Sequence, residues 1–215
     1  MRPSTALSAD GPANLLQAVT LAALPSARNR GAMIVLNDRI GAAWYTEKTN
    51  GNVLDTFKAV KQGYIGGFLD NKPFFYFTPS QPLFKNTFSV ANLSTAPLPR
   101  VDILISYEDF DGVLIQAAIA AGAKGLVIAG TGAGATTSLA EPHISAALLA
   151  GIPIVISSKT NGGAVEPGSS AGEEVSSGYL NPVKSRLQLQ LALAHGMGLE
   201  QIRGLFEDKL GAFLQ

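Results

Sequence analysis

The second half of the chain alternates between short apolar runs and longer stretches with helical character. The apolar runs are residues 100–106, 123–129 and 152–157, each rich in isoleucine, leucine and valine. Residues 113–121 and 137–150 lie between these runs and predict helices. Because strands and helices alternate along the chain, the pattern predicts a parallel sheet whose strands are joined by right-handed crossovers.

The first half begins with a helix signal. Asp10 precedes Gly11 and Pro12, an order typical of a helix start, and we expect the Asp10 carboxylate to cap that helix. Pro25 ends the pattern. The apolar positions with helical spacing are Leu15, Leu16, Val19, Ala22 and Ala23.

Two strands and a short helix are predicted next. Residues 31–36 form a continuous apolar run, which predicts a buried strand. Residues 40–45 are expected to form a second strand after a turn at Asn37 and Asp38. Residues 53–60 are expected to form a short helix.

Prolines and small polar residues gather between residues 78 and 99, a composition typical of a connection between domains. We place the linker at residues 86–99, between a first part at 1–85 and a second domain at 100–215. The predicted fold class is α/β: the end of a larger α/β domain, followed by a small parallel-sheet (flavodoxin-like) α/β domain. In that second domain, two helices follow a glycine- and serine-rich loop and close the chain.

Composition narrows the possible partners. Lys and Arg together number 16, as do Asp and Glu, so the chain has no basic excess for a nucleic acid or an anionic membrane. The absence of cysteine excludes a thiolate nucleophile and a cysteine zinc site. No apolar run is long enough to cross a bilayer. We therefore expect no nucleic-acid or membrane partner.

Few residues predict chemistry on their own. The run G-T-G-A-G at residues 130–134 lacks the Gly-Lys-Ser/Thr ending of a phosphate loop, and a tight turn explains it better than a phosphate site does. His143 and His195 have no partner at ligand spacing and are expected to be surface or capping residues. Lys48 follows an apolar strand, where partial burial would lower the pKa of its amine and make it a base; the alternative is an ordinary surface lysine.

Three segments resemble the L-asparaginase family, in its order and rough spacing. Residues 2–12 resemble the family segment R-P-x-[ST]-x-x-[ST]-x-D-G-P. Lys48, Thr49 and Asn50 resemble its lysine-bearing K-T-N loop, with residues 55–57 in the helix that follows. Residues 178–186 resemble its late G-x-L-N-P-x-K-x-R helix start, and the resemblance covers the whole chain.

The resemblance implies a homotetrameric asparaginase that hydrolyses L-asparagine, or L-glutamine, without a cofactor or metal. It implies a threonine nucleophile and makes Lys48 the catalytic lysine. The K-T-N form favours the periplasmic or secreted kind over the cytoplasmic kind. The family motifs T-G-G-T-I and G-T-D-T, which carry the nucleophile and a second threonine with an aspartate, do not occur in these 215 residues. We therefore expect a fragment in which Met1 corresponds to an internal position of the family.

Two features leave the substrate preference open. Ala135 stands where the family's G-x-G-N loop has an asparagine that reaches the neighbouring subunit's site. A family glutamate corresponds to Glu166, Glu173 or Glu174, and the sequence does not choose among them. Two other functions remain as alternatives: a non-catalytic α/β binding module and an asparaginase-like subunit of an amidotransferase.

Overall fold

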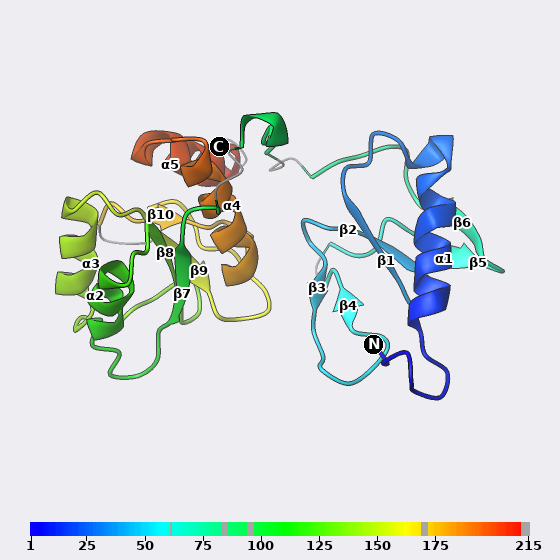
Figure 1. Cartoon of the computed structure of the whole chain (residues 1–215), viewed down its shortest axis with the longest axis horizontal. Helices are drawn as coiled ribbons and strands as arrows, with labels where there is room; N and C mark the ends of the chain where they lie inside the picture. The colour runs from blue at the N-terminus through cyan, green and yellow to red at the C-terminus, as the bar shows by residue number, and fades with distance from the viewer. Residues whose placement is uncertain (61, 83–85, 94–96, 169–171, 212–215) are drawn as a thin grey trace. The chain divides into compact units, whose positions relative to one another are not determined.

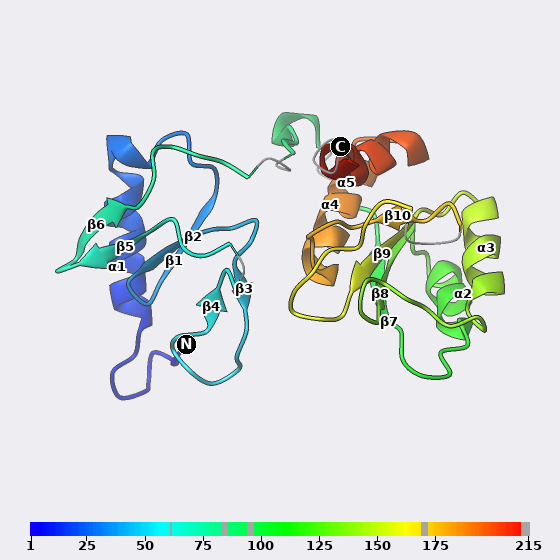
Figure 2. The same cartoon turned by 180° about the vertical axis from the view of Figure 1, so that it is seen from behind.

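A computed structural model describes the chain except for residues 61, 83–85, 94–96, 169–171 and 212–215. It divides into two compact units, Met1–Lys85 and Asn86–Gln215 (Figures 1 and 2). The second unit includes the described residues of the predicted linker, which contact its helices: Asn86 Nδ2 donates to the Leu205 carbonyl (2.9 Å) and Gln190 Nε2 donates to the Pro99 carbonyl (2.9 Å).

The described residues of unit 1 form the helix α1, a four-stranded antiparallel sheet of order β1-β2-β5-β6 and a separate two-stranded sheet (Figure 1). Its elements are α1 (Gly11–Ala22), the 3-10 turn η1 (Pro25–Ala27), β1 (Met33–Leu36), β2 (Arg39–Ala42), β3 (Glu47–Lys48), β4 (Phe57–Lys58), β5 (Gly66–Leu69) and β6 (Lys72–Phe75). Two-residue turns join β1 to β2 and β5 to β6, and all four turn residues have positive φ. Asn and Asp tolerate that conformation, which explains Asn37-Asp38 and Asp70-Asn71 at these turns.

The helix α1 lies where the sequence predicts it, but a different face is buried. Gln17 and Leu21 are buried: the Gln17 amide nitrogen donates to Asp38 Oδ1 (2.5 Å), and Leu21 packs with Ile40 and Phe68. The apolar positions on which the prediction relied are exposed, Leu15 at 66%, Leu16 at 58% and Val19 at 61%. The helix is therefore oriented by polar contacts to the hairpin turn as well as by its apolar face.

Unit 2 has a parallel sheet of order β10-β9-β8-β7, in which the strands lie in chain order. Its elements are the 3-10 turn η2 (Val90–Asn92), β7 (Val101–Ile105), α2 (Val113–Ala120), β8 (Gly125–Gly130), α3 (Glu141–Leu149), β9 (Ile154–Ser158), β10 (Val175–Ser176), α4 (Pro182–Ala194) and α5 (Leu199–Gly211). Helices α2 and α3 cover one face of the sheet and α4 covers the other (Figures 1 and 2). The α/β class and the alternating parallel arrangement are thus confirmed.

The core of unit 2 explains why its strands are continuous apolar runs. Every residue of β8 is buried, because helices cover both faces of the sheet. Leu126 and Ile128 pack with Ile115 and Ile144, from the side of α2 and α3. At the start of α4, the Asn181 side chain accepts a hydrogen bond from the Lys184 amide (2.9 Å), so the predicted helix start at Asn181-Pro182 is confirmed.

The glycine-rich run after β8 is a tight turn. The Gly134 and Ala135 amides donate to the Thr131 carbonyl (3.0 and 2.8 Å), so these donors are used within the turn. Gly134 has a φ of +100°, and a Cβ there would lie 2.6 Å from Ile156 Cγ2. The preferred interpretation of the run, a turn that needs glycine, is confirmed.

Replacing Gly134 by Ala should lower the free energy of unfolding by about 2 kcal/mol or more, since it combines backbone strain with overpacking against Ile156. Gly132→Ala is the matched control: its φ is +56°, and a Cβ there meets no atom within 4 Å. Urea unfolding of both variants checks the difference. Equal losses of unfolding free energy in Gly134→Ala and Gly132→Ala would show that the added methyl group is accommodated beside Ile156 without cost.

Candidate active site

Lys48 lies in a small hairpin of unit 1, residues 47–58, which we call the lysine hairpin. Strand β3 pairs antiparallel with β4, and Lys48 is directly opposite Phe57. The Lys48 side chain is exposed, and its Nζ lies 3.9 Å from Met1 Sδ. Of the two alternatives given for Lys48, the structure shows the surface lysine. Its strand, β3, has two residues and pairs, in the part of the chain the structure describes, with β4 alone.

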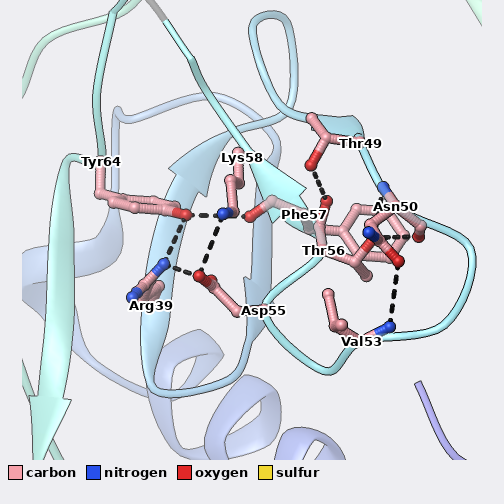
Figure 3. A network of polar contacts seen from close by, with 9 residues as sticks. All are labelled: Arg39, Thr49, Asn50, Val53, Asp55, Thr56, Phe57, Lys58 and Tyr64. Atoms are coloured by element: carbon pink, nitrogen blue, oxygen red, sulfur yellow. Dashed lines mark hydrogen bonds and ion pairs between the residues drawn. The ribbon is translucent and has the colours of Figure 1, made fainter.

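The loop of the hairpin is closed by Asn50 and Thr56 (Figure 3). The buried Thr56 hydroxyl accepts from the Asn50 amide (2.9 Å) and donates to the Asn50 carbonyl. The Asn50 side-chain oxygen in turn accepts from the Asn52 and Val53 amides (2.8 and 3.2 Å). In the K-T-N segment, Asn50 therefore shapes the backbone that follows the lysine.

The short helix predicted at residues 53–60 is wrong. The Thr56 carbonyl accepts hydrogen bonds from the Thr49 amide (2.8 Å) and the Thr49 hydroxyl (3.0 Å). Phe57 belongs to β4, which pairs with β3. These contacts to the other arm of the hairpin replace the hydrogen bonds that a helix would need.

A charged cluster joins the lysine hairpin to β2, and we call it the Arg39 cluster: Arg39, Asp55, Lys58 and Tyr64 (Figure 3). Arg39 Nη1 forms an ion pair with Asp55 and donates to the Tyr64 hydroxyl (2.9 Å). Lys58 Nζ lies 3.1 Å from the other Asp55 oxygen. The hydrogen bond with Tyr64 is the largest cause that raises the pKa of Arg39 above its ordinary value, and the charge of Asp55 makes a smaller contribution in the same direction.

The N-terminal segment lies against this hairpin. The Met1 amino group donates to the Val53 carbonyl (3.3 Å), and the N-terminus lies beside β3 and β4 in Figure 1. The Arg2 amide donates to Asp10 Oδ1 (2.6 Å), which closes the loop before α1. Two of the three segments that resemble the L-asparaginase family are thus side by side in unit 1.

The capping role expected for Asp10 is wrong. Asp10 occupies the position before the first turn of α1, but its side chain accepts no hydrogen bond from the helix backbone. Its carboxylate accepts instead from the Arg2 amide and from the Asn14 side chain (3.0 Å). Asp10 therefore holds the N-terminal loop rather than the helix end.

The contact with Arg2 predicts a pH dependence of that loop. The hydrogen bond from the Arg2 amide lowers the pKa of the Asp10 carboxyl below its ordinary value of 3.8. A depressed folded-state pKa means that the contact is fully formed above the unfolded pKa and is lost as the pH falls through the folded one. An NMR titration of the Arg2 amide should show a midpoint below 3.8, and Asp10→Asn should abolish it. A midpoint at or above 3.8 would contradict the hydrogen bond.

Comparison with known proteins identifies the relatives of both units. The family model described as "Asparaginase, N-terminal" matches residues 1–81, and the one described as "Glutaminase/Asparaginase C-terminal domain" matches residues 100–206. The crystal structure of a probable cytoplasmic L-asparaginase from Campylobacter jejuni is 35% identical, with a TM-score of 0.84 over 95% of this chain and 68% of that one. The chain belongs to the asparaginase family.

Asparaginases of several organisms are similar over nearly the whole chain. L-asparaginase 2-3 of Saccharomyces cerevisiae is 46% identical over 98% of this chain, which covers 59% of the yeast protein. L-asparaginase 2 of Bacillus subtilis is 40% identical over 97% of this chain, which covers 56% of that protein. The chain therefore spans less than two thirds of the length of these asparaginases.

The two histidines of unit 2 lie in structural contacts. Both ring nitrogens of His195 lie near backbone carbonyls, Leu191 at 2.8 Å and Ser89 at 3.1 Å, so this histidine joins the end of α4 to the segment before β7. The ring of His143 packs close to Gly112. Both contacts agree with the structural roles expected for the two histidines.

The three glutamates proposed from the asparaginase pattern differ in their surroundings. Glu174 is buried, whereas Glu166 and Glu173 are exposed. Arg203 of α5 donates to the backbone carbonyls of Glu173 (2.9 Å) and Glu174 (3.3 Å) and so fixes the start of β10. The glutamate of the family pattern stays unassigned among the three.

The described residues contain no group of three or more His, Asp or Glu side chains placed to hold a metal ion. None of their helices is long and apolar enough to cross a membrane.

Proposed function

We propose that this chain contributes the catalytic lysine of an L-asparagine amidohydrolase, and that this lysine is Lys48. The observation that supports the proposal is the K-T-N segment, whose lysine lies at a fixed place in the ladder between β3 and β4. The N-terminal segment of the family pattern lies beside it. The names of the similar yeast and bacterial proteins agree with this reaction.

In the proposed reaction, a threonine hydroxyl attacks the side-chain amide carbon of asparagine. The hydroxyl proton passes to a base, the carbon–nitrogen bond breaks and ammonia leaves with a proton. Water then cleaves the acyl ester, which releases aspartate and restores the threonine. Lys48 would serve the proton transfers as its ammonium or its amine.

The groups with which Lys48 would act belong to motifs that this sequence does not contain. The nucleophile and its partners belong to the T-G-G-T-I and G-T-D-T motifs of the family, which the 215 residues lack. Among the described residues, Lys48 Nζ has the Met1 sulfur as its neighbour and forms no ion pair. We therefore propose that Lys48 acts only when those motifs are supplied by the rest of an asparaginase.

The substrate and the assembly are part of the proposal. We propose L-asparagine as substrate, with L-glutamine as the competitor to be tested, because Ala135 replaces an asparagine of the family pattern. An alanine has no amide with which to reach a neighbouring site. We also propose a homotetramer, as the family resemblance implies, and a periplasmic or secreted location from the K-T-N form.

A chimera tests the function. In this yeast chimera, the stretch of Saccharomyces cerevisiae L-asparaginase 2-3 that matches our chain is replaced by residues 1–215. We expect it to release ammonia and aspartate from asparagine, with the unaltered yeast protein as positive control. A folded chimera without turnover would favour the non-catalytic binding module, and turnover only with a second, ammonia-consuming enzyme would favour the amidotransferase subunit.

A further inference from the structure

The backbone of Arg39 is held in the sheet of unit 1. It lies in β2, an inner strand of the four-stranded sheet, and is opposite Leu36 of β1 on one side and Gly67 of β5 on the other. The next residue, Ile40, is fully buried in the core of the unit. The backbone from which the Arg39 side chain extends is therefore fixed on both sides.

From this strand, the Arg39 side chain reaches the lysine hairpin by two routes (Figure 3). The first is direct, through the ion pair with Asp55 at the end of the loop. The second passes through Tyr64, whose hydroxyl accepts from Arg39 (2.9 Å) and donates to the Phe57 carbonyl (3.1 Å). Phe57 is the residue opposite Lys48 in the ladder, so the second route ends beside the lysine.

We propose that Arg39 is a positioning residue, which fixes the orientation of the lysine hairpin, and with it Lys48, on the sheet of unit 1. The catalytic consequence of this role rests on the proposed function of Lys48. The role of Arg39 in holding the hairpin is independent of that proposed function, since it follows from the contacts of Arg39, Asp55 and Tyr64 alone.

The exposure of the cluster indicates positioning rather than general stabilisation. The side chains of Arg39, Asp55 and Lys58 are 40%, 42% and 41% exposed, so solvent screens their charges and the ion pairs add little to global stability. An isolated two-stranded hairpin, in contrast, is marginal in water. Local contacts of this size are therefore expected to decide where the hairpin lies while hardly changing the melting temperature.

Hydrogen exchange of the 215-residue chain tests the positioning directly. The reporters are the amides of Thr49 and Asn50, which donate to Thr56 across the loop. We expect Arg39→Met to speed their exchange by about tenfold and Tyr64→Phe by about fivefold, the effect of losing one or two modest contacts. The amides of Ile65 and Phe68, which donate to the Ile40 and Asp38 carbonyls in the sheet of unit 1 (2.9 Å each), should keep their rates, because a loss of stability of the whole unit would accelerate them too.

Arg28→Met is the matched control. Arg28 is an exposed arginine with no hydrogen bond or ion pair to the hairpin within the described part of the chain. Arg28→Met should leave the exchange rates of the Thr49 and Asn50 amides unchanged. Equal exchange rates in the original chain, Arg39→Met and Tyr64→Phe would overturn the positioning role, and so would acceleration that extends equally to the Ile65 and Phe68 amides of the unit 1 sheet.

Kinetics of the yeast chimera separate this inference from the proposed function. Arg39→Met should lower kcat several-fold with little change in KM. Arg39→Lys should recover part of the loss, because lysine keeps the charge but lacks the guanidinium whose Nη1 contacts both Asp55 and Tyr64. A change in KM alone would overturn the catalytic consequence. If Lys48→Met proves harmless in the chimera, the proposed function fails, and hydrogen exchange still decides the role of Arg39.

Discussion

Lys48→Met in the yeast chimera should lower kcat for asparagine by about 100-fold or more, the loss expected when a proton-transfer group is removed. Methionine has similar length but no charge and cannot accept or donate the proton. Lys48 is exposed and has few contacts, so the substitution should leave folding intact. Steady-state ammonia release, with the melting temperature measured in parallel, checks both statements.

The matched control is Lys72→Met, which changes an exposed lysine on β6 of the same unit in the same way. We expect it to retain the turnover of the chimera. Near-unchanged turnover in Lys48→Met would mean that the K-T-N lysine is not catalytic. Equal losses in the two variants would show a general effect of removing charge.

The 215-residue chain by itself should release no ammonia from asparagine or glutamine above the blank. Catalysis by nucleophilic attack needs an activated hydroxyl held against the substrate. The chain lacks the T-G-G-T-I and G-T-D-T motifs, and in the described part Lys48 Nζ has a sulfur rather than a hydroxyl or carboxylate beside it. A lysine alone therefore has no nucleophile to activate.

This expectation is meaningful only for folded protein. Circular dichroism, with the exchange protection of the β8 amides in unit 2 and of the Ile65 and Phe68 amides in unit 1, should first show that the sheets of both units are formed. Clear amidase activity from such material, removed by a general serine or threonine reagent, would place a nucleophile within these residues. The hypothesis that the motifs come from outside the chain would then be wrong.

The parallel sheet of unit 2 could be predicted because its signals are local. The strands β7, β8 and β9 are continuous apolar runs, and helices on both faces require that composition. The start of α4 could be predicted for the same reason, since the side chain of Asn181 accepts a hydrogen bond from the Lys184 amide, three residues along the chain. Strand β10 was missed because it has two residues, Val175 and Ser176, inside a glycine- and serine-rich stretch.

The surroundings of Lys48 could not be predicted, because they depend on contacts between distant residues. Arg39, Asp55 and Tyr64 have no characteristic spacing, and the sheet and the hairpin bring them together only after folding. The helix α1 shows the same limit in another form. The helix was predicted from the spacing of its leucines, but Gln17 is the residue that is buried, and its side chain is hydrogen-bonded to Asp38, 21 residues further along the chain.

The most direct test of the central claim is ammonia release from asparagine, measured side by side for the 215-residue chain, the yeast chimera and the chimera with Lys48→Met. If Lys48 is the lysine of an asparaginase site completed by the rest of the enzyme, the chimera alone turns over asparagine. Equal turnover by the chimera with and without Lys48, or turnover by the isolated chain, would contradict it.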